Sequence, residues 1–128
     1  MSKKLLLDTS IIIDFLRIKD KSKSLFYKLA SEGANFSASM LTHTELYAGK
    51  SVWESNIARQ ELELVFGGIE LVGLTEKISV NAGKIRALYN LDLIDSIIAS
   101  TAIEINMPLV SLNTRHFSKV GNLKLFDL

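Results

Sequence analysis

The stretch that settles the fold class is residues 5–16, which read LLLDTSIIIDFL. Its first three residues are apolar without a break, which is typical of a strand covered on both faces, as in a parallel sheet. A helical pattern follows at once, and Thr9 and Ser10 are residue types that can cap it. Asp8 stands between the two elements. This position is the carboxyl end of the predicted strand. Open parallel sheets bind ligands at the carboxyl ends of their strands, so Asp8 is the first candidate site residue.

The rest of the chain continues the alternation of strands and helices. Further short strands are expected at residues 36–39, 69–72, 108–111 and 124–126. Helices are expected at about 25–32, 41–49, 51–66, 75–88 and 92–106, with one helical turn at 115–117. This order indicates an α/β domain with a short, mostly parallel sheet. Neither a repeat nor a domain boundary is visible, so residues 1–128 are expected to form a single domain.

Composition excludes several classes of protein. The 128 residues include no Cys, which rules out a disulfide scaffold and any thiolate metal site or nucleophile. A net charge of +1 is too small for a strongly basic nucleic-acid coat, although local basic patches remain compatible with a nuclease. No apolar run is long enough to span a membrane, and the N-terminal apolar run is too short for a signal peptide. We therefore expect a cytoplasmic protein.

Three carboxylates stand where the pattern asks for apolar or small residues: Asp8, Glu45 and Asp95. Each has an ordinary alternative, since Asp8 and Asp95 could cap helices and Glu45 could be solvated. If the three converge, their mutual repulsion requires a proton or a cation. Two carboxylates ~4 Å apart repel by about 4 kcal/mol at an effective dielectric of ~20. Oxygen-only ligands favour Mg²⁺ or Mn²⁺, and such an ion suits hydrolysis of a phosphodiester.

Four segments resemble the motifs of PIN domains, and specifically of VapC-type toxins. They are residues 5–16, 39–49 (SMLTHTELYAG), 95–102 (DSIIASTA) and 108–117 (PLVSLNTRHF), in the order of that family. The resemblance covers essentially the whole chain. It implies a three-layer α/β/α domain that acts as a metal-dependent endoribonuclease and inhibits translation. It also implies a cognate antitoxin and a toxin homodimer.

By position in these motifs, the resemblance makes Asp8, Glu45 and Asp95 the acidic metal ligands. Thr9 or Ser10 would hold the first acid or a water on the metal.

The fourth motif departs from the pattern of many members, which have an acid there. Asn113 and His116 occupy the corresponding positions. Asn113 can ligate through its amide oxygen but adds no charge, so we expect one firmly bound ion rather than two. His116 could contact a phosphate when protonated. Arg17, Lys19 and Arg115 are candidate contacts to RNA phosphates.

Two other functions remain open from the sequence. The weakened fourth motif is compatible with a catalytically weak or inactive PIN-fold module that only binds a protein partner. A phosphotransfer domain that uses Asp8 as its nucleophile is disfavoured, because haloacid-dehalogenase-like phosphatases need a second Asp two residues later and Ser10 stands there.

Overall fold

A sheet of four parallel strands, in the order β3-β2-β1-β4, lies at the centre of the computed structural model, which describes residues 3–128. The strands are β1 (Lys4–Leu7), β2 (Asn35–Ser39), β3 (Ile69–Val72) and β4 (Leu109–Val110). The chain steps outward from β1 to β3 and then crosses back to form β4 on the other side of β1. The carboxyl ends of β1 and β4 therefore flank the point where the strand order reverses, which is where such sheets bind ligands.

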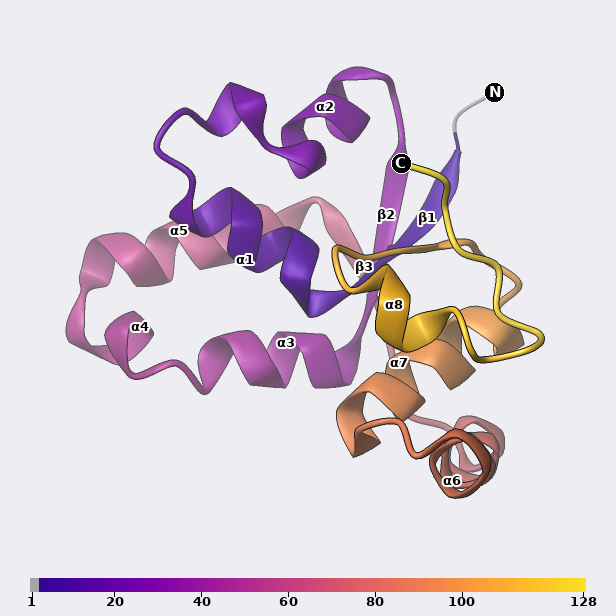
Figure 1. Ribbon diagram of the computed structural model, residues 1–128. Coiled ribbons are helices and arrows are strands. Elements are labelled where there is room, and N and C mark those ends of the chain that lie inside the picture. Colours follow the sequence, from indigo (N-terminus) through magenta and orange to yellow (C-terminus); the bar gives the residue numbers. More distant parts are fainter. Residues whose placement is uncertain (1–2) are drawn as a thin grey trace.

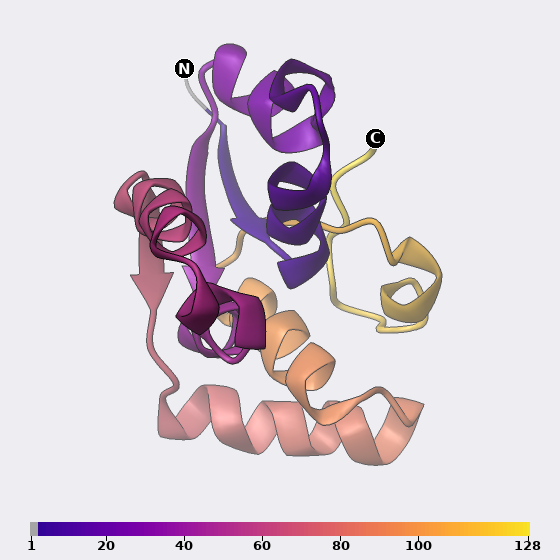
Figure 2. The same ribbon diagram turned by 90° about the vertical axis from the view of Figure 1, so that its left-hand side faces the viewer.

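Eight α-helices and a 3₁₀ turn, η1 (Lys21–Lys23), connect the strands in residues 3–128. The helices are α1 (Thr9–Arg17), α2 (Leu25–Ser31), α3 (Met40–Tyr47), α4 (Lys50–Glu54), α5 (Asn56–Gly67), α6 (Glu76–Tyr89), α7 (Leu93–Glu104) and α8 (Thr114–Phe117). Figures 1 and 2 show α6 and α7 well apart from α1, α2 and α5. This arrangement confirms the expected three-layer α/β/α fold with a short parallel sheet.

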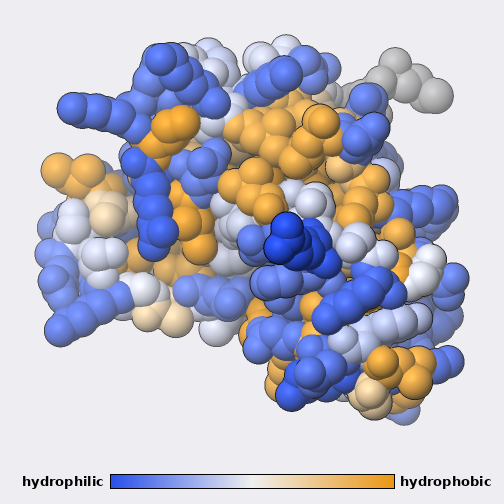
Figure 3. All heavy atoms as spheres, in the orientation of Figure 1, coloured by the Kyte–Doolittle hydropathy of each residue, from blue (hydrophilic) through white to orange (hydrophobic). Residues whose placement is uncertain are grey.

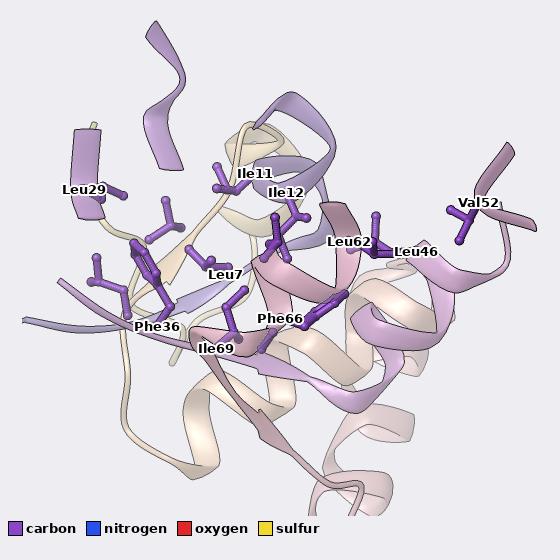
Figure 4. Close-up of a cluster of buried hydrophobic side chains, with 14 residues drawn as sticks. Leu7, Ile11, Ile12, Leu29, Phe36, Leu46, Val52, Leu62, Phe66 and Ile69 are labelled. Atoms are coloured by element: carbon purple, nitrogen blue, oxygen red, sulfur yellow. The ribbon is translucent and has the colours of Figure 1, made fainter. Parts of the chain in front are cut away.

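The three leucines of β1 explain why the strand is apolar throughout. Leu5 and Leu7 belong to a core cluster with residues of α1, α2 and α5, whereas Leu6 belongs to a second cluster with residues of α6, α7 and α8. Figure 4 shows the first cluster, in which Leu7 lies with Ile11 and Phe66. Because successive side chains of a strand point to opposite faces, β1 contributes to both cores.

One expected helix is two helices. The sequence pattern over 51–66 predicts a single element, but the chain is extended at Ser55, with φ −135° and ψ 120°, between α4 and α5. The Ser55 hydroxyl accepts a hydrogen bond from the backbone N–H of Ala58 and so caps α5. The prediction of an uninterrupted helix was wrong because a local cap replaces the helical hydrogen bonds at this point.

Two smaller expectations also fail. The strand expected at 124–126 is only an isolated bridge between Leu109 and Leu125. The residue at the N-cap position of α1 is Asp8, while Thr9 and Ser10 lie inside the helix. Within residues 3–128, none of the helices has the length and apolar character needed to cross a bilayer.

Candidate metal centre

Asp8 lies at the carboxyl end of β1 and is 2% exposed. Its side chain makes no capping hydrogen bond to α1, so the reading of this residue as a simple helix cap is wrong. Instead its Oδ2 accepts hydrogen bonds from the hydroxyls of Ser10, at 2.8 Å, and Ser111, at 2.7 Å. The backbone N–H of Asp8 also donates to the carbonyl of Val110, which fixes β1 against β4.

Glu45 reaches the same edge of the sheet from α3. Although the residue is exposed, its Oε1 accepts a 2.7 Å hydrogen bond from the hydroxyl of Thr9. The hydroxyl of the buried Thr42 lies 3.1 Å from Thr9 Oγ1. Thr9 is the residue next to Asp8, so this contact ties α3 to the start of α1. The structure therefore uses Ser10 to hold Asp8 and Thr9 to hold Glu45.

Asp95 lies in the first turn of α7, which packs against both α6 and α3, and is half-buried. Its pKa is raised to about 6, first by burial and then by the negative charges of Asp8, Asp92 and Glu45; the positive charge of His116 acts in the opposite direction. The cluster thus gathers acids from β1, α3 and α7. Repulsion among them makes a proton or a cation favourable at this place.

The acids are near one another without forming a finished cage. No three acidic or histidine side chains of residues 3–128 lie close enough together to hold a metal ion as they stand. The donor set still suits a hard divalent cation, because it consists of carboxylate oxygens. Asp8 Oδ1 receives no hydrogen bond from residues 3–128 and is available as a ligand. An ion that keeps several waters, as Mg²⁺ does, fits this loose arrangement.

The fourth motif lies beside the cluster, on β4 and α8. Asn113 and His116 are both exposed, and Asn113 precedes α8 without capping it through its side chain. Phe117, which follows His116, is fully buried in the second core cluster and anchors α8 to the domain. The motif is therefore anchored to the domain by Phe117, and its two polar side chains are accessible.

Two grooves lie near the acidic cluster, and Arg17 lines both. One has a volume of about 320 Å³ and is bordered by Glu45 and Ser51. The other, of about 450 Å³, is bordered by Ser10 and Asn113. None of the ion pairs among residues 3–128 involves Arg17, so its guanidinium is available to a ligand.

Lys19 and Arg115, the other two candidate RNA contacts, are exposed but line neither of these grooves.

Ser111 is the residue at this site that sequence reasoning did not single out. It is 1% exposed and follows β4 directly. The available signal was its place at the end of a strand that had to lie near β1 in a parallel sheet. Serine is too common at strand ends for that position alone to indicate a role.

A model of the PIN domain family matches residues 5–123. Ribonuclease VapC19 of Mycobacterium tuberculosis is 34% identical over 124 residues, which are 93% of this chain and 96% of that protein. A chain of the VapBC-1 structure from nontypeable Haemophilus influenzae superposes with a TM-score of 0.78 at 22% identity, over 97% of both chains. A chain of a toxin–antitoxin complex from Klebsiella pneumoniae gives a TM-score of 0.74 at 23% identity, over 97% of this chain and 99% of that one. The acidic cluster at the switch point of this sheet is thus that of a member of the PIN domain family, to which the chain belongs.

Proposed function

We propose that this protein is a metal-dependent endoribonuclease toxin of the VapC type, which hydrolyses RNA phosphodiesters and thereby inhibits translation. The observation that carries the proposal is the environment of Asp95, whose pKa is raised first by burial and then by the nearby negative charges of Asp8, Asp92 and Glu45. The 34% identity to a protein named a ribonuclease, over nearly the full length of both chains, supports the same activity.

Asp8, Glu45 and Asp95 are the proposed ligands of one Mg²⁺ or Mn²⁺ ion, with Asn113 as a weaker fourth ligand. When bound, the ion would supply a Lewis acid for the phosphodiester and a water of lowered pKa. The chain's own contribution is to fix the carboxylates before substrate arrives. Ser10 and Thr9 do so through the hydrogen bonds to Asp8 and Glu45. The exposed His116 is proposed to contact a phosphate oxygen of the substrate.

RNA is proposed to run along the two grooves that share Arg17, one of which is bordered by Glu45. Its guanidinium can bind a phosphate through two parallel hydrogen bonds, and it lines both grooves. Lys19 and Arg115 would add weaker attraction from the rims. The small net charge of the chain makes these local cations important for RNA binding.

Replacing Arg17 with Ala should weaken RNA binding about 3- to 10-fold and reduce the slope of log Kd against log salt by about 1, because one phosphate contact is lost. Binding is measured with an Asp95→Asn background, so that the RNA stays uncut. Arg86→Ala is the matched control, since Arg86 is occupied at the end of α6 by the carbonyl of Leu91. An unchanged salt slope in the Arg17 variant would remove this residue from the RNA path.

A cognate antitoxin is proposed to cover the acidic edge and to insert a basic side chain among the carboxylates. Repulsion among the three acids favours such a cation, and a structural relative is described as a toxin–antitoxin complex. Apolar side chains on α5 also support a protein partner, since Ile57 and Leu64 are 79% and 80% exposed. On the face drawn in Figure 3, the largest group of hydrophobic residues lies in the upper centre, and smaller groups lie at the left and at the lower right.

We also propose that the toxin is a homodimer and that it acts in the cytoplasm, where translated RNA is found.

Titration of Mn²⁺ by calorimetry into protein free of antitoxin tests the metal centre without a choice of RNA. Wild-type protein should bind, and Asp95→Asn should bind at least ~10-fold more weakly, which is about 1.4 kcal/mol. Absence of binding by the wild type would instead favour the alternative function, a PIN-fold module that only binds a partner. The loose spacing of the acids is the observation on which that alternative rests.

A further inference from the structure

The hydroxyls that hold Asp8 are themselves held by the backbone after β4. The N–H of Leu112 donates to Ser10 Oγ at 3.1 Å, and the N–H of Asn113 donates to Ser111 Oγ at 2.9 Å. A hydroxyl carries a single proton. Since each oxygen here already accepts from an N–H, its own proton is directed to Asp8 Oδ2. The two backbone amides therefore fix the direction of both hydroxyl hydrogen bonds.

This arrangement treats the two oxygens of Asp8 differently. Oδ2 receives both hydroxyl protons and is turned toward Ser10 and Ser111. Oδ1 receives no hydrogen bond from residues 3–128. Rotation of the carboxyl group would break two hydrogen bonds at a residue that is only 2% exposed. The carboxylate is thus locked with one oxygen used by the protein and the other available.

We propose that Ser111 is a positioning residue of the metal centre, which fixes Asp8 so that Oδ1 alone is offered to a divalent cation. The inference rests on the proposed function. In many members of the family an acid in the segment after β4 would add negative charge to the metal site, whereas here the segment contributes a hydroxyl group that orients Asp8. In this chain the segment orients the first acid through Ser111, whereas Asn113 in the same segment brings no charge.

We expect Ser111 to contribute more than Ser10 to the orientation of Asp8, because the two serines differ in their distance from Asp8 along the chain. Ser10 is two residues from Asp8 and belongs to the same turn of α1. Ser111 is 103 residues away, is buried, and brings β4 to the carboxylate of β1. Without its hydroxyl, the Asn113 N–H and Asp8 Oδ2 each lose a partner. Residues that orient metal ligands in this way typically change metal affinity by 10- to 100-fold when replaced.

The test is the affinity for Mn²⁺, measured by calorimetry on the full-length variants. Ser111→Ala should bind Mn²⁺ at least ~10-fold more weakly than the wild type. Ser100→Ala is the matched control, because Ser100 is fully buried and its hydroxyl donates to the carbonyl of Ile78, between α7 and α6. That control should lose thermal stability to a similar degree and keep Mn²⁺ affinity within about two-fold.

A second pair of variants separates the hydroxyl from the shape of the side chain. Thr and Val have nearly the same volume, and only Thr retains the donor. Ser111→Thr should therefore bind Mn²⁺ at least ~10-fold more tightly than Ser111→Val, whatever strain the added methyl groups cause in both. This comparison keeps the test decisive if Ser111→Ala does not fold.

Equal Mn²⁺ affinity in Ser111→Thr and Ser111→Val, or wild-type affinity in Ser111→Ala, would overturn the inference. Either result leaves the proposed function in place if the wild type binds Mn²⁺ and Asp95→Asn binds it more weakly. Failure of the wild type to bind Mn²⁺ would overturn the metal centre and, with it, the role of Ser111.

Discussion

Replacing Asp95 with Asn should stop RNA cleavage while raising the melting temperature of the metal-free protein. Loss of a carboxylate from the proposed metal centre is expected to lower the cleavage rate by about 100- to 1000-fold, a barrier change of about 2.7–4 kcal/mol. The same substitution removes a charge that the folded protein disfavours. Few substitutions at buried polar positions are expected to stabilise a fold. Loss of cleavage together with a higher melting temperature would therefore indicate that Asp95 lies in a cluster of mutually repelling acids.

The stability effect has a defined pH dependence. The pKa of Asp95 is raised from 3.8 to about 6 in the folded protein, so the folded state holds this proton more tightly than the unfolded chain. The wild type therefore loses stability as pH rises from about 4 to about 6, and the loss persists at higher pH. After allowance for solvent screening of this half-buried group, the penalty is about 1–2 kcal/mol. The Asp95→Asn variant does not have this penalty, because the amide group stays uncharged.

Thermal unfolding in EDTA measures this effect. At pH 7 the Asp95→Asn variant should melt roughly 3–8 °C above the wild type, and at pH 4 the two should melt together. Asp20→Asn is a suitable control, because it makes the same change of charge at the start of η1, where Asn can still accept the hydrogen bond from Ser22. A lower melting temperature for Asp95→Asn at pH 7 would contradict repulsion among the acids.

Replacing Phe117 with Ala should cost about 3–5 kcal/mol of stability, because the ring is fully buried and its removal leaves a cavity in the second core. For a chain of this length the melting temperature is expected to fall by roughly 10–20 °C. Phe117 is also the only deeply buried residue of α8, so its loss should loosen the segment that carries Asn113 and His116. RNA cleavage is therefore expected to fall further than the folded fraction does.

Phe36→Ala provides the comparison for this prediction. Phe36 lies on β2, is nearly buried, and belongs to the first core cluster, away from α8. Both variants should lose stability to a comparable extent. Measured at a temperature where both are folded, only Phe117→Ala should show weaker Mn²⁺ binding. If Phe117→Ala unfolded within 1 kcal/mol of the wild type, the anchoring role of this ring would be wrong.

The parts of the fold that could be predicted are those that depend on short-range pattern. β1 was evident because a strand buried on both faces must be apolar at every position, and β3 occurs at residues 69–72 as expected. The interruption at Ser55 could not be predicted, because apolar residues continue at helical spacing on both sides of it. A single serine within such a pattern does not indicate whether one helix continues or a second helix begins. The bridge at Leu125 is too short to leave a periodic signal.

The site was less predictable than the fold for a related reason. Asp8, Glu45 and Asp95 were noticeable because charges interrupted apolar patterns. Ser111 interrupted nothing, and its importance comes from a contact with a residue 103 positions earlier. Whether three acids converge depends likewise on the order of the strands, which local pattern does not determine. Only the structure brings β4 beside β1 and so places both strand ends at one edge.

The pairing of the first strand with the last has a consequence during synthesis of the protein. Asp8 is synthesised 103 residues before Ser111, so it leaves the ribosome well before β4, Ser111 and α8 can fold against it. The growing chain can therefore present its first acid but cannot lock it. The carboxylate of Asp8 can therefore become oriented only after the segment that contains β4 and Ser111 has been synthesised and has left the ribosome.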